Sequence, residues 1–161
     1  MSDNKDQNLT PTSSATTAGT AAFGGDSPNL AAAALGGLIA AIVGALIWAV
    51  ITVTAKFQIG FMAVGVGFLV AWAVRTLGKG RDTTFGIIGG GFALLGCLLG
   101  NLLSACGFIA VQAAEPVMSV TLRVLGNPSS IATILQETFR GMDLLFYAIA
   151  VYEGYKLARR P

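Results

Sequence analysis

The sequence predicts an all-α membrane protein in which four transmembrane helices form a bundle packed through glycine and alanine. Of its 161 residues, 54% are hydrophobic and only 11% are charged, and the mean hydropathy is +0.72. A soluble domain carries about 25% charged residues, so this chain could not cover a surface that faces water. Four long apolar runs follow one another, and glycines recur within them at helical spacing. These observations together define the expected fold class.

Residues 1–29 are expected to be a polar, disordered N-terminal tail. They are mainly Ser, Thr, Ala, Gly, Asn and Asp, with few large apolar side chains. Such a segment buries too little surface to offset its ordering entropy. The start MSDNKDQNLT lacks the basic region of a signal peptide, so the first apolar run is expected to be an uncleaved anchor. A docking arm is the functional alternative for the tail.

Residues 30–161 form the expected four-helix transmembrane domain. Crossing about 30 Å of hydrocarbon takes about 17–25 apolar residues. The expected spans are 31–53, 57–74, 85–111 and 142–158. Lys56 and Gln58 mark a tight turn between the first two spans, and Arg75 to Thr84 form a polar basic loop before the third.

The segment 113–141 predicts an amphipathic helix that lies in the membrane interface between the third and fourth spans. Glu115-Pro116 and Asn127-Pro128 are helix breakers or helix starts. After the second pair, apolar residues recur at helical spacing: Ile131, Ile134, Leu135 and Phe139. This pattern favours an interfacial helix, and a re-entrant segment is the alternative.

Basic residues near the span ends predict that both termini lie in the cytoplasm. On one side of a four-span arrangement lie Arg75, Lys79, Arg81, Lys156, Arg159 and Arg160. On the other side lie Lys56, Arg123 and Arg140. Because cytoplasmic loops carry the excess of Lys and Arg, the first side is expected to be cytoplasmic.

Small residues along the runs predict close helix packing. Lipid gives no hydrophobic drive for helix association, so helix interfaces use residues that let the backbones approach. On the third run one face is mainly Gly, and the opposite face carries Ile and Leu, so the third helix is expected to be central. The expected packing positions are Gly36, Gly44, Gly67, Gly86, Gly90, Gly96 and Gly100.

Four polar residues within the runs are the candidate functional positions. Asn101 and Ser104 lie on the glycine face, where they either line a polar path or make an interhelical hydrogen bond. Asp143 and Glu153 lie in one arc of about 120° on the fourth helix, facing the bundle. Ionisable groups in a membrane are functional candidates by default. Since both acids lie near helix ends, an ion pair or a cap is the alternative to a proton or ion relay.

The chain lacks the residue sets of common catalytic and metal sites. It has no histidine, which excludes a histidine-assisted nucleophile, and with no thiol beyond two cysteines a structural zinc site lacks its ligands. Cys97 and Cys106 lie about 13 Å apart along one helix, too far for a disulfide. No concentrated basic face suggests nucleic acid. We therefore expect no enzyme, no cofactor, no metal and no nucleic-acid partner.

Three stretches of the sequence are similar to those of a known protein family: KFQIGFMAVGVGFLVAWAVR (Lys56 to Arg75), FGIIGGGFALLGCLLGN (Phe85 to Asn101) and DLLFYAIAVYEGYK (Asp143 to Lys156). From about Leu30 to Arg160, the chain resembles a family of small bacterial four-helix inner-membrane proteins of uncharacterised function. The resemblance implies a bacterial cytoplasmic membrane. It supplies no activity and no site residues.

The expected function is that of a non-catalytic multispan membrane protein, acting as an accessory or scaffold subunit or as a small homo-oligomer. Its expected partners are the lipid bilayer and either another membrane protein or a second copy of the chain. The alternative is a small transporter or channel whose pathway uses Asn101, Ser104, Asp143 and Glu153.

Overall fold

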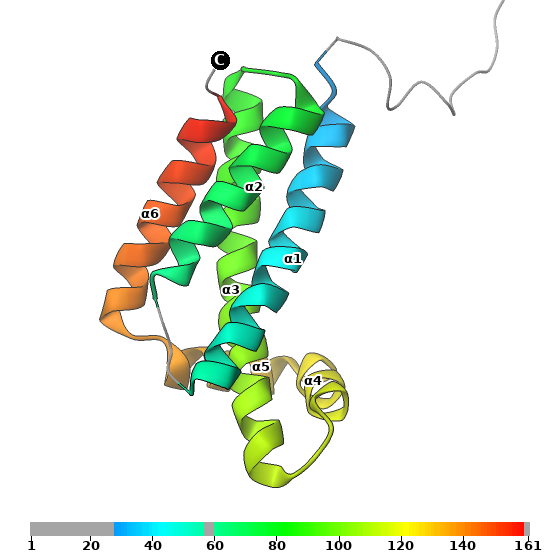
Figure 1. Cartoon of the computed structure of the whole chain (residues 1–161), viewed down its shortest axis with the longest axis vertical. Coiled ribbons are helices and arrows are strands. Elements are labelled where there is room, and N and C mark those ends of the chain that lie inside the picture. Colours follow the sequence, from blue (N-terminus) through cyan, green and yellow to red (C-terminus); the bar gives the residue numbers. More distant parts are fainter. Residues whose placement is uncertain (1–27, 57–59, 160–161) are drawn as a thin grey trace, which may run out of the picture.

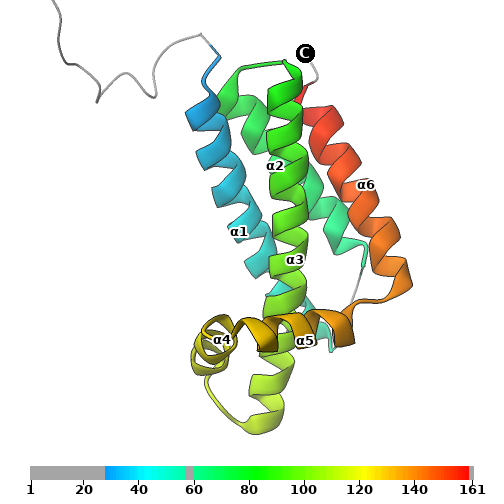
Figure 2. The ribbon, with the colours of Figure 1, turned by 180° about the vertical axis from the view of Figure 1, so that it is seen from behind.

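The computed structural model describes residues 28–56 and 60–159, which form six helices and no strand. The helices are α1 (Leu30–Ala55), α2 (Met62–Gly78), α3 (Thr83–Ala113), α4 (Val117–Leu125), α5 (Pro128–Thr138) and α6 (Gly141–Ala158). Helices α1, α2, α3 and α6 run along the long axis of the molecule, and α4 and α5 lie across it at one end (Figures 1 and 2). The expected all-helical bundle is confirmed.

Helix α3 is the centre of the bundle, as its glycine face predicts. Within the described part of the chain it contacts each of the other five helices. Helices α1 and α6 both pack on α2 and α3, which lie between them. The lower part of α3 continues beyond the bundle and carries α4 and α5 (Figure 2).

Helices α1 and α3 cover the predicted first and third spans. Among the described helices, these two are long and apolar enough to cross a membrane by length and composition. Helix α2 is apolar but has only 17 residues. Helix α6 carries Asp143, Glu153 and Lys156 within its 18 residues.

The predicted bounds of the second helix are wrong at both ends. Helix α2 begins at Met62 instead of residue 57, after a turn in which Ala63 N donates to Gly60 O at 3.1 Å. It then continues through Arg75, the first residue of the predicted basic loop, and ends at Gly78. A basic residue in the last turn is favourable beside the C-terminal carbonyls. The loop that follows is therefore shorter than predicted.

Segment 113–141 contains two short helices where one was predicted. Pro116 precedes the first residue of α4, and Pro128 is the first residue of α5, so both Pro residues start helices. Helix α4 buries only Val120 and Val124. These valines pack with Ile131 of α5 against the lower part of α3, where they form a second hydrophobic core.

Asn29 belongs to the bundle and not to the N-terminal tail. Its Oδ1 accepts a hydrogen bond from Ala32 N at 3.0 Å and caps α1. Its N–H donates to Gly78 O at 2.8 Å, which ties the start of α1 to the end of α2. The predicted disorder of the tail lies outside the described residues, apart from Pro28 and Asn29. The start of α1 and the end of α6 lie at the same end of the molecule (Figure 1).

Helix α1 buries small residues and exposes large ones. Its buried face is mostly alanine and glycine, and Ala33, Ala41 and Ala45 are completely buried. Its outer face is leucine, isoleucine and valine, and Ile39 and Val50 are 60% and 63% exposed. A helix of a water-soluble bundle has the opposite arrangement, with the large apolar side chains inside and polar side chains outside.

Candidate functional site

The seven glycines that were predicted to pack helices all lie against another helix. An added Cβ would contact a side chain or backbone atom of the neighbour at each of them. Sorted by the helix they face, they are Gly36 and Gly44 (α2), Gly96 and Gly100 (α1), and Gly67, Gly86 and Gly90 (α6). Gly96 also faces Val66 of α2.

Helix α6 is held by direct backbone contacts to both of its neighbours. A Cβ on Gly154 would lie 2.7 Å from Gly89 O, and a Cβ on Gly89 would overlap Gly154 O. On the other side, a Cβ on Gly67 would lie 2.7 Å from Ala150 O. Backbone atoms cannot move aside as the tip of a flexible side chain can. These contacts therefore require glycine and fix α6 against α2 and α3.

A polar and aromatic cluster fills the bundle core toward the end that carries α4 and α5. Helix α1 contributes Trp48, with Thr52 one turn further along its buried face, α3 contributes Asn101, and α6 contributes Asp143 and Tyr147. All five are buried, and the most exposed of them, Asp143, is 7% exposed. Because these residues come from three helices, their contacts set the spacing of the bundle at this level.

Tyr147 is the centre of the cluster. Its hydroxyl donates to Cys97 O at 3.3 Å. Its ring makes an edge contact with Trp48 at a centroid distance of 6.5 Å. A second edge contact, at 5.7 Å, joins it to Phe139 at the end of α5. Tyr147 thus connects α6 to α1, α3 and α5.

Asp143 caps the start of α6. Its Oδ2 accepts a hydrogen bond from Arg140 N at 3.0 Å, and its own N–H donates to Arg140 O at 2.9 Å. A carboxylate in the first turn is also favoured by the helix dipole. Of the two roles proposed from the sequence, the geometry therefore supports the cap.

The structure does not place all four polar candidates together. Asn101 and Asp143 both lie next to Tyr147. Ser104 donates to Gly100 O of its own helix at 2.7 Å. Glu153 is half-buried and lies ten residues beyond Asp143, about 15 Å along α6. Between the two acids, the face of α6 that packs on the bundle is closed by fully buried Ala150.

Sequence reasoning missed Trp48 and Thr52 as members of the cluster. Trp48 Nε1 and Thr52 Oγ1 are buried and have no hydrogen-bond partner among the described residues. The sequence does contain a pattern that indicates their burial, because both residues continue the helical spacing of buried Ala41 and Ala45. The remaining contacts of the cluster join one helix to another or cap a helix. Chemically, the arrangement therefore serves packing.

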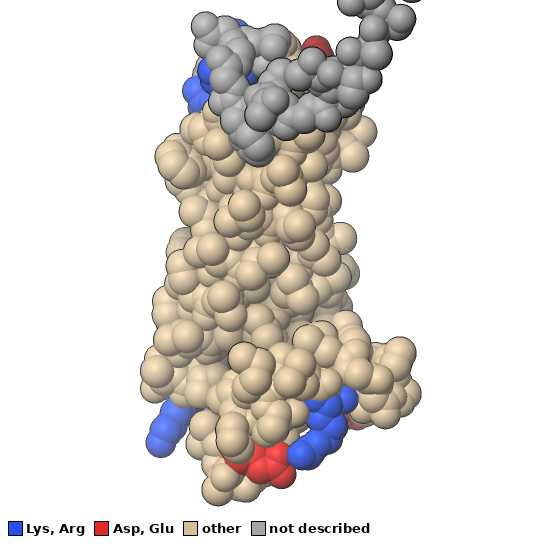
Figure 3. All heavy atoms as spheres, turned by 90° about the vertical axis from the view of Figure 1, so that its right-hand side faces the viewer, with Lys and Arg blue, Asp and Glu red and all other residues tan. Residues whose placement is uncertain are grey.

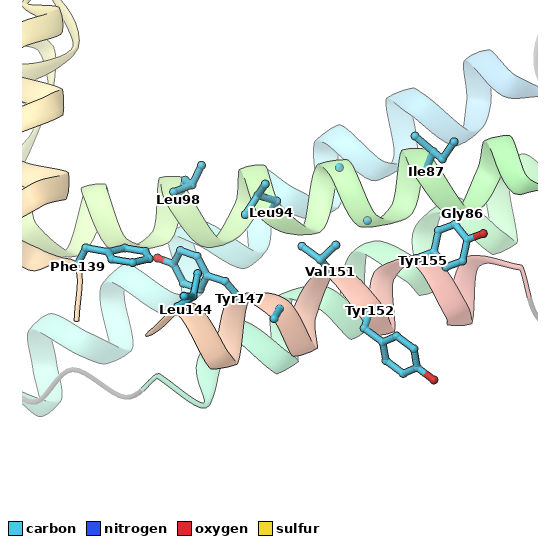
Figure 4. A pocket seen from close by; sticks show the side chains of 13 residues that line it. Gly86, Ile87, Leu94, Leu98, Phe139, Leu144, Tyr147, Val151, Tyr152 and Tyr155 are labelled. Carbon is cyan, nitrogen blue, oxygen red and sulfur yellow. The ribbon is translucent and has the colours of Figure 1, made fainter. Parts of the chain in front are cut away.

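A second feature is an apolar groove of about 870 Å³ between α3 and α6. Leu94 and Leu98 line it from α3, and Val151 and Tyr155 line it from α6 (Figure 4). Phe139 of the α5–α6 connection lies at one end, and Tyr155 lies beside Gly86 at the other. Neither sequence periodicity nor composition predicts this groove, because it is formed by two helices that lie far apart in the chain.

Comparisons with protein-family models, curated proteins and solved structures found no match to this chain. The resemblance to small bacterial inner-membrane proteins therefore stays a prediction. In the described part of the chain, no group of three or more His, Cys, Asp or Glu residues could hold a metal ion. The function is argued below from packing, charge and shape.

Proposed function

We propose that this chain is an integral membrane protein whose four long helices, α1, α2, α3 and α6, span the bilayer. The observation that carries the proposal is the arrangement of α1, which buries alanine and glycine and exposes leucine, isoleucine and valine. Water would penalise that arrangement. Lipid favours it, because hydrocarbon solvates the large side chains while small residues let the helices approach.

The distribution of charge supports the same location. On the face in Figure 3, charged atoms gather at the two ends, and the surface between them is uncharged. Helices α1 and α3 carry no charged residue, and their 26 and 31 residues extend about 39 and 46 Å. Helices α2 and α6 extend about 26 and 27 Å, which is close to the lower limit for about 30 Å of hydrocarbon.

Helices α4 and α5 fit the interface between hydrocarbon and water. They lie across the bundle axis (Figure 2). The outer surface of α4 carries Met118 and Leu122, which are 69% and 62% exposed, together with the charged Arg123. A helix with an apolar face and a charged face lies in the plane of a membrane surface.

The orientation follows from the basic residues. The end with the start of α1 and the end of α6 carries Lys79, Arg81, Lys156 and Arg159. The positive-inside rule places this end, and with it both termini, in the cytoplasm. The bacterial inner membrane is the location that the family resemblance implies.

Within the membrane, we propose a non-catalytic role as an accessory or scaffold subunit or as a small homo-oligomer. The closed interior supports this role, because fully buried Ala150 lies between the two acids and the Gly89–Gly154 contact closes the bundle beside Glu153. Ser104 donates to Gly100 O of its own helix, and Asp143 accepts from Arg140 N at the start of α6, so these two side chains are engaged in local hydrogen bonds. A transporter or channel is therefore not favoured by the geometry.

The membrane location is tested by alkaline extraction and by reporter fusions. We expect the chain to stay in the membrane pellet at high pH. A reporter fused after Arg159 should be active only in the cytoplasm, and one inserted at Gly126 only on the opposite side. Release into the soluble fraction would contradict the proposal. A C-terminal reporter that is active outside the cytoplasm would contradict the orientation.

The role is tested by purification from native membranes in a mild detergent, followed by size analysis and mass spectrometry. A stoichiometric second protein would support an accessory subunit, and a single species of several copies would support a homo-oligomer. A monomer that conducts ions or solutes in liposomes, with flux lost in Asp143→Asn, would overturn the non-transport role.

A further inference from the structure

We propose that the groove between α3 and α6 binds an anionic phospholipid from the leaflet at the C-terminal end of α6. One acyl chain would lie along the groove, and the phosphate would lie beside Lys156 and Arg159. This inference rests on the proposed membrane location. Shape, lining and charge each support it.

The groove is shorter than the hydrocarbon core and ends at Phe139. From Gly86 to Leu98 it follows α3 for twelve residues, or about 18 Å, against about 30 Å for the full hydrocarbon core. Phe139 lies at the end opposite Tyr155 (Figure 4), and α5 crosses in front of α3 (Figure 2). A spanning helix of a second copy would need the full thickness and would meet α5. An acyl chain that ends within the groove would not.

The α3 side of the groove is open and apolar at Gly91. A Cβ on Gly91 would have no atom of another residue within 4 Å, so the backbone of α3 is bare at this point. Leucine and valine side chains line the groove on either side of this bare backbone. A flexible hydrocarbon chain fills such a surface without leaving polar groups unpaired.

Two cations lie at the outer end of the groove. Lys156 Nζ donates to Tyr152 Oη at 2.8 Å, and Arg159 Nη1 donates to Tyr155 Oη at 2.6 Å. Both tyrosines line the groove, and each cation lies 5.0 Å from the ring centroid of its tyrosine. The Arg159 stem also lies against α3, because Arg159 Cδ is 2.6 Å from where a Cβ on Gly86 would be.

These cations are positioned for an anionic ligand. Both side chains are exposed. An ammonium has three donors and a guanidinium five, so each keeps donors beyond its bond to tyrosine. Arginine binds phosphate through two parallel hydrogen bonds. Basic pockets between transmembrane helices on the cytoplasmic side bind anionic head groups.

The wider charge of this end agrees with an anionic head group. The basic residues of the described chain here are Arg75, Lys79, Arg81, Lys156 and Arg159. The acids are Asp82 and Glu153, so five positive charges oppose two negative ones and leave a net charge of +3. A zwitterionic head group would gain little from this excess.

The test is a lipid-binding measurement on the full chain, purified in mild detergent and stripped of native lipid. Native mass spectrometry would count bound phosphatidylglycerol and bound phosphatidylcholine at equal concentrations. We expect phosphatidylglycerol to bind roughly tenfold more tightly or better, given about 1 kcal/mol for each of two cations and 1.4 kcal/mol per factor of ten. The double variant Lys156→Gln/Arg159→Gln should lower this preference to about twofold or less.

A matched pair of glycine variants tests the groove itself. Gly91→Leu would fill the groove, whereas Gly65→Leu adds the same side chain to an exposed position on α2. At both positions a Cβ has no neighbour within 4 Å, so both variants should fold. We expect Gly91→Leu to lose the bound phosphatidylglycerol and Gly65→Leu to retain it. Equal retention by the two variants would overturn the proposal.

Other outcomes are equally decisive. Equal affinity for the two lipids in the unmodified chain would overturn the head-group assignment. If the unmodified chain binds no lipid and forms a dimer that Gly91→Leu abolishes, the groove would be assigned to a second copy of the chain. If Gly91→Leu loses its helical circular dichroism, the fluorescence of Leu94→Trp would decide, in a chain in which exposed Trp72 is replaced by Phe. Quenching by brominated phosphatidylglycerol that persists in excess phosphatidylcholine supports the site, and its absence overturns it.

Alkaline extraction of the unmodified chain separates this inference from the proposed function. A chain released from membranes would overturn both proposals. A chain that stays in the membrane and shows no lipid selectivity would overturn only the lipid site.

Discussion

The two ends of the bundle are held together in opposite ways. Toward the end where α1 begins and α6 finishes, α6 lies against α3 through Gly89 and Gly154, with backbone facing backbone. Toward the end with α4 and α5, the rings of Trp48, Tyr147 and Phe139 fill the space between helices. The contact between Gly89 and Gly154 tolerates no added atom, whereas the ring cluster depends on every ring that fills it. The same substitution therefore has different consequences at the two ends.

The geometry of α1 and α6 explains this difference. Helices α2 and α3 lie between them, so their backbones do not pack on each other. Trp48 and Tyr147 nevertheless meet with their ring centroids 6.5 Å apart. Large rings are needed to reach across this distance, whereas the α3–α6 contact needs no side chain at all.

The largest effect should come from adding a side chain at the glycine end. Gly89→Leu would place its Cβ on Gly154 O, so α6 must move away from α3. Overpacking a close-packed core lowers the free energy of unfolding by about 1–3 kcal/mol. We expect about 3 kcal/mol for Gly89→Leu, because the atom that blocks the new side chain belongs to the backbone. Unfolding in mixed micelles would measure the loss.

The control for Gly89→Leu lies two residues further along α3. Gly91→Leu adds the same side chain where a Cβ meets nothing within 4 Å, and it should change stability by less than about 0.5 kcal/mol. Equal losses at the two positions would show that the α3–α6 backbone contact does not determine stability.

The next largest effect should come from removing a ring at the other end. Trp48→Ala would leave a cavity beside Tyr147 and Gly100. In soluble cores such a change costs about 3–5 kcal/mol. In lipid, Trp48 stays in hydrocarbon even when the chain unfolds, so the free energy of transfer from water contributes less to stability. We therefore expect Trp48→Ala to lower the free energy of unfolding by about 2 kcal/mol.

Helix α2 supplies the control for Trp48→Ala. Trp72 is 59% exposed, so Trp72→Ala should cost no more than a few tenths of a kcal/mol. A cost for Trp72→Ala as large as that for Trp48→Ala would mean that the aromatic cluster contributes no specific packing.

The sequence predicts the long helices and the glycine contacts better than the aromatic cluster. Runs of uncharged residues locate α1 and α3 to within two residues of their observed ends. The position of Trp48 is harder to predict, because both faces of α1 are apolar and hydrophobicity alone does not say which face is buried. The size of the residues does, since alanine and glycine mark the buried face.

The remaining errors have local physical causes. Helix α4 has only nine residues, and its buried face is reduced to Val120 and Val124, which gives little periodicity to detect. The start of α2 depends on Gly60, where a Cβ would lie 2.7 Å from the Phe146 ring of α6. That contact joins residues far apart in the chain, so no local pattern reports it.

A smaller effect should follow from removing the cap at the start of α6. Asp143→Ala removes the acceptor of Arg140 N and should cost about 1 kcal/mol, as for other N-terminal caps. Asp143→Asn keeps a side-chain oxygen in place and should cost only a few tenths of a kcal/mol. Thermal unfolding in detergent would measure both. If Asn costs as much as Ala, the charge matters more than the hydrogen bond, and the ion-relay alternative for Asp143 gains support.

The smallest effect should come from the exposed ion pair on the interfacial segment. Arg123 Nη2 lies 2.9 Å from Glu115 Oε2, and these side chains are 69% and 38% exposed. Exposed pairs contribute about 0–1 kcal/mol and are screened by salt, so Arg123→Gln should cost about 0.3 kcal/mol in dilute buffer and less in high salt. Unfolding measured at low and high salt in both chains would test this. A loss of 1 kcal/mol or more that persists in high salt would mean that the pair orders α4 on α3, and that the second end depends on charge as well as on large side chains.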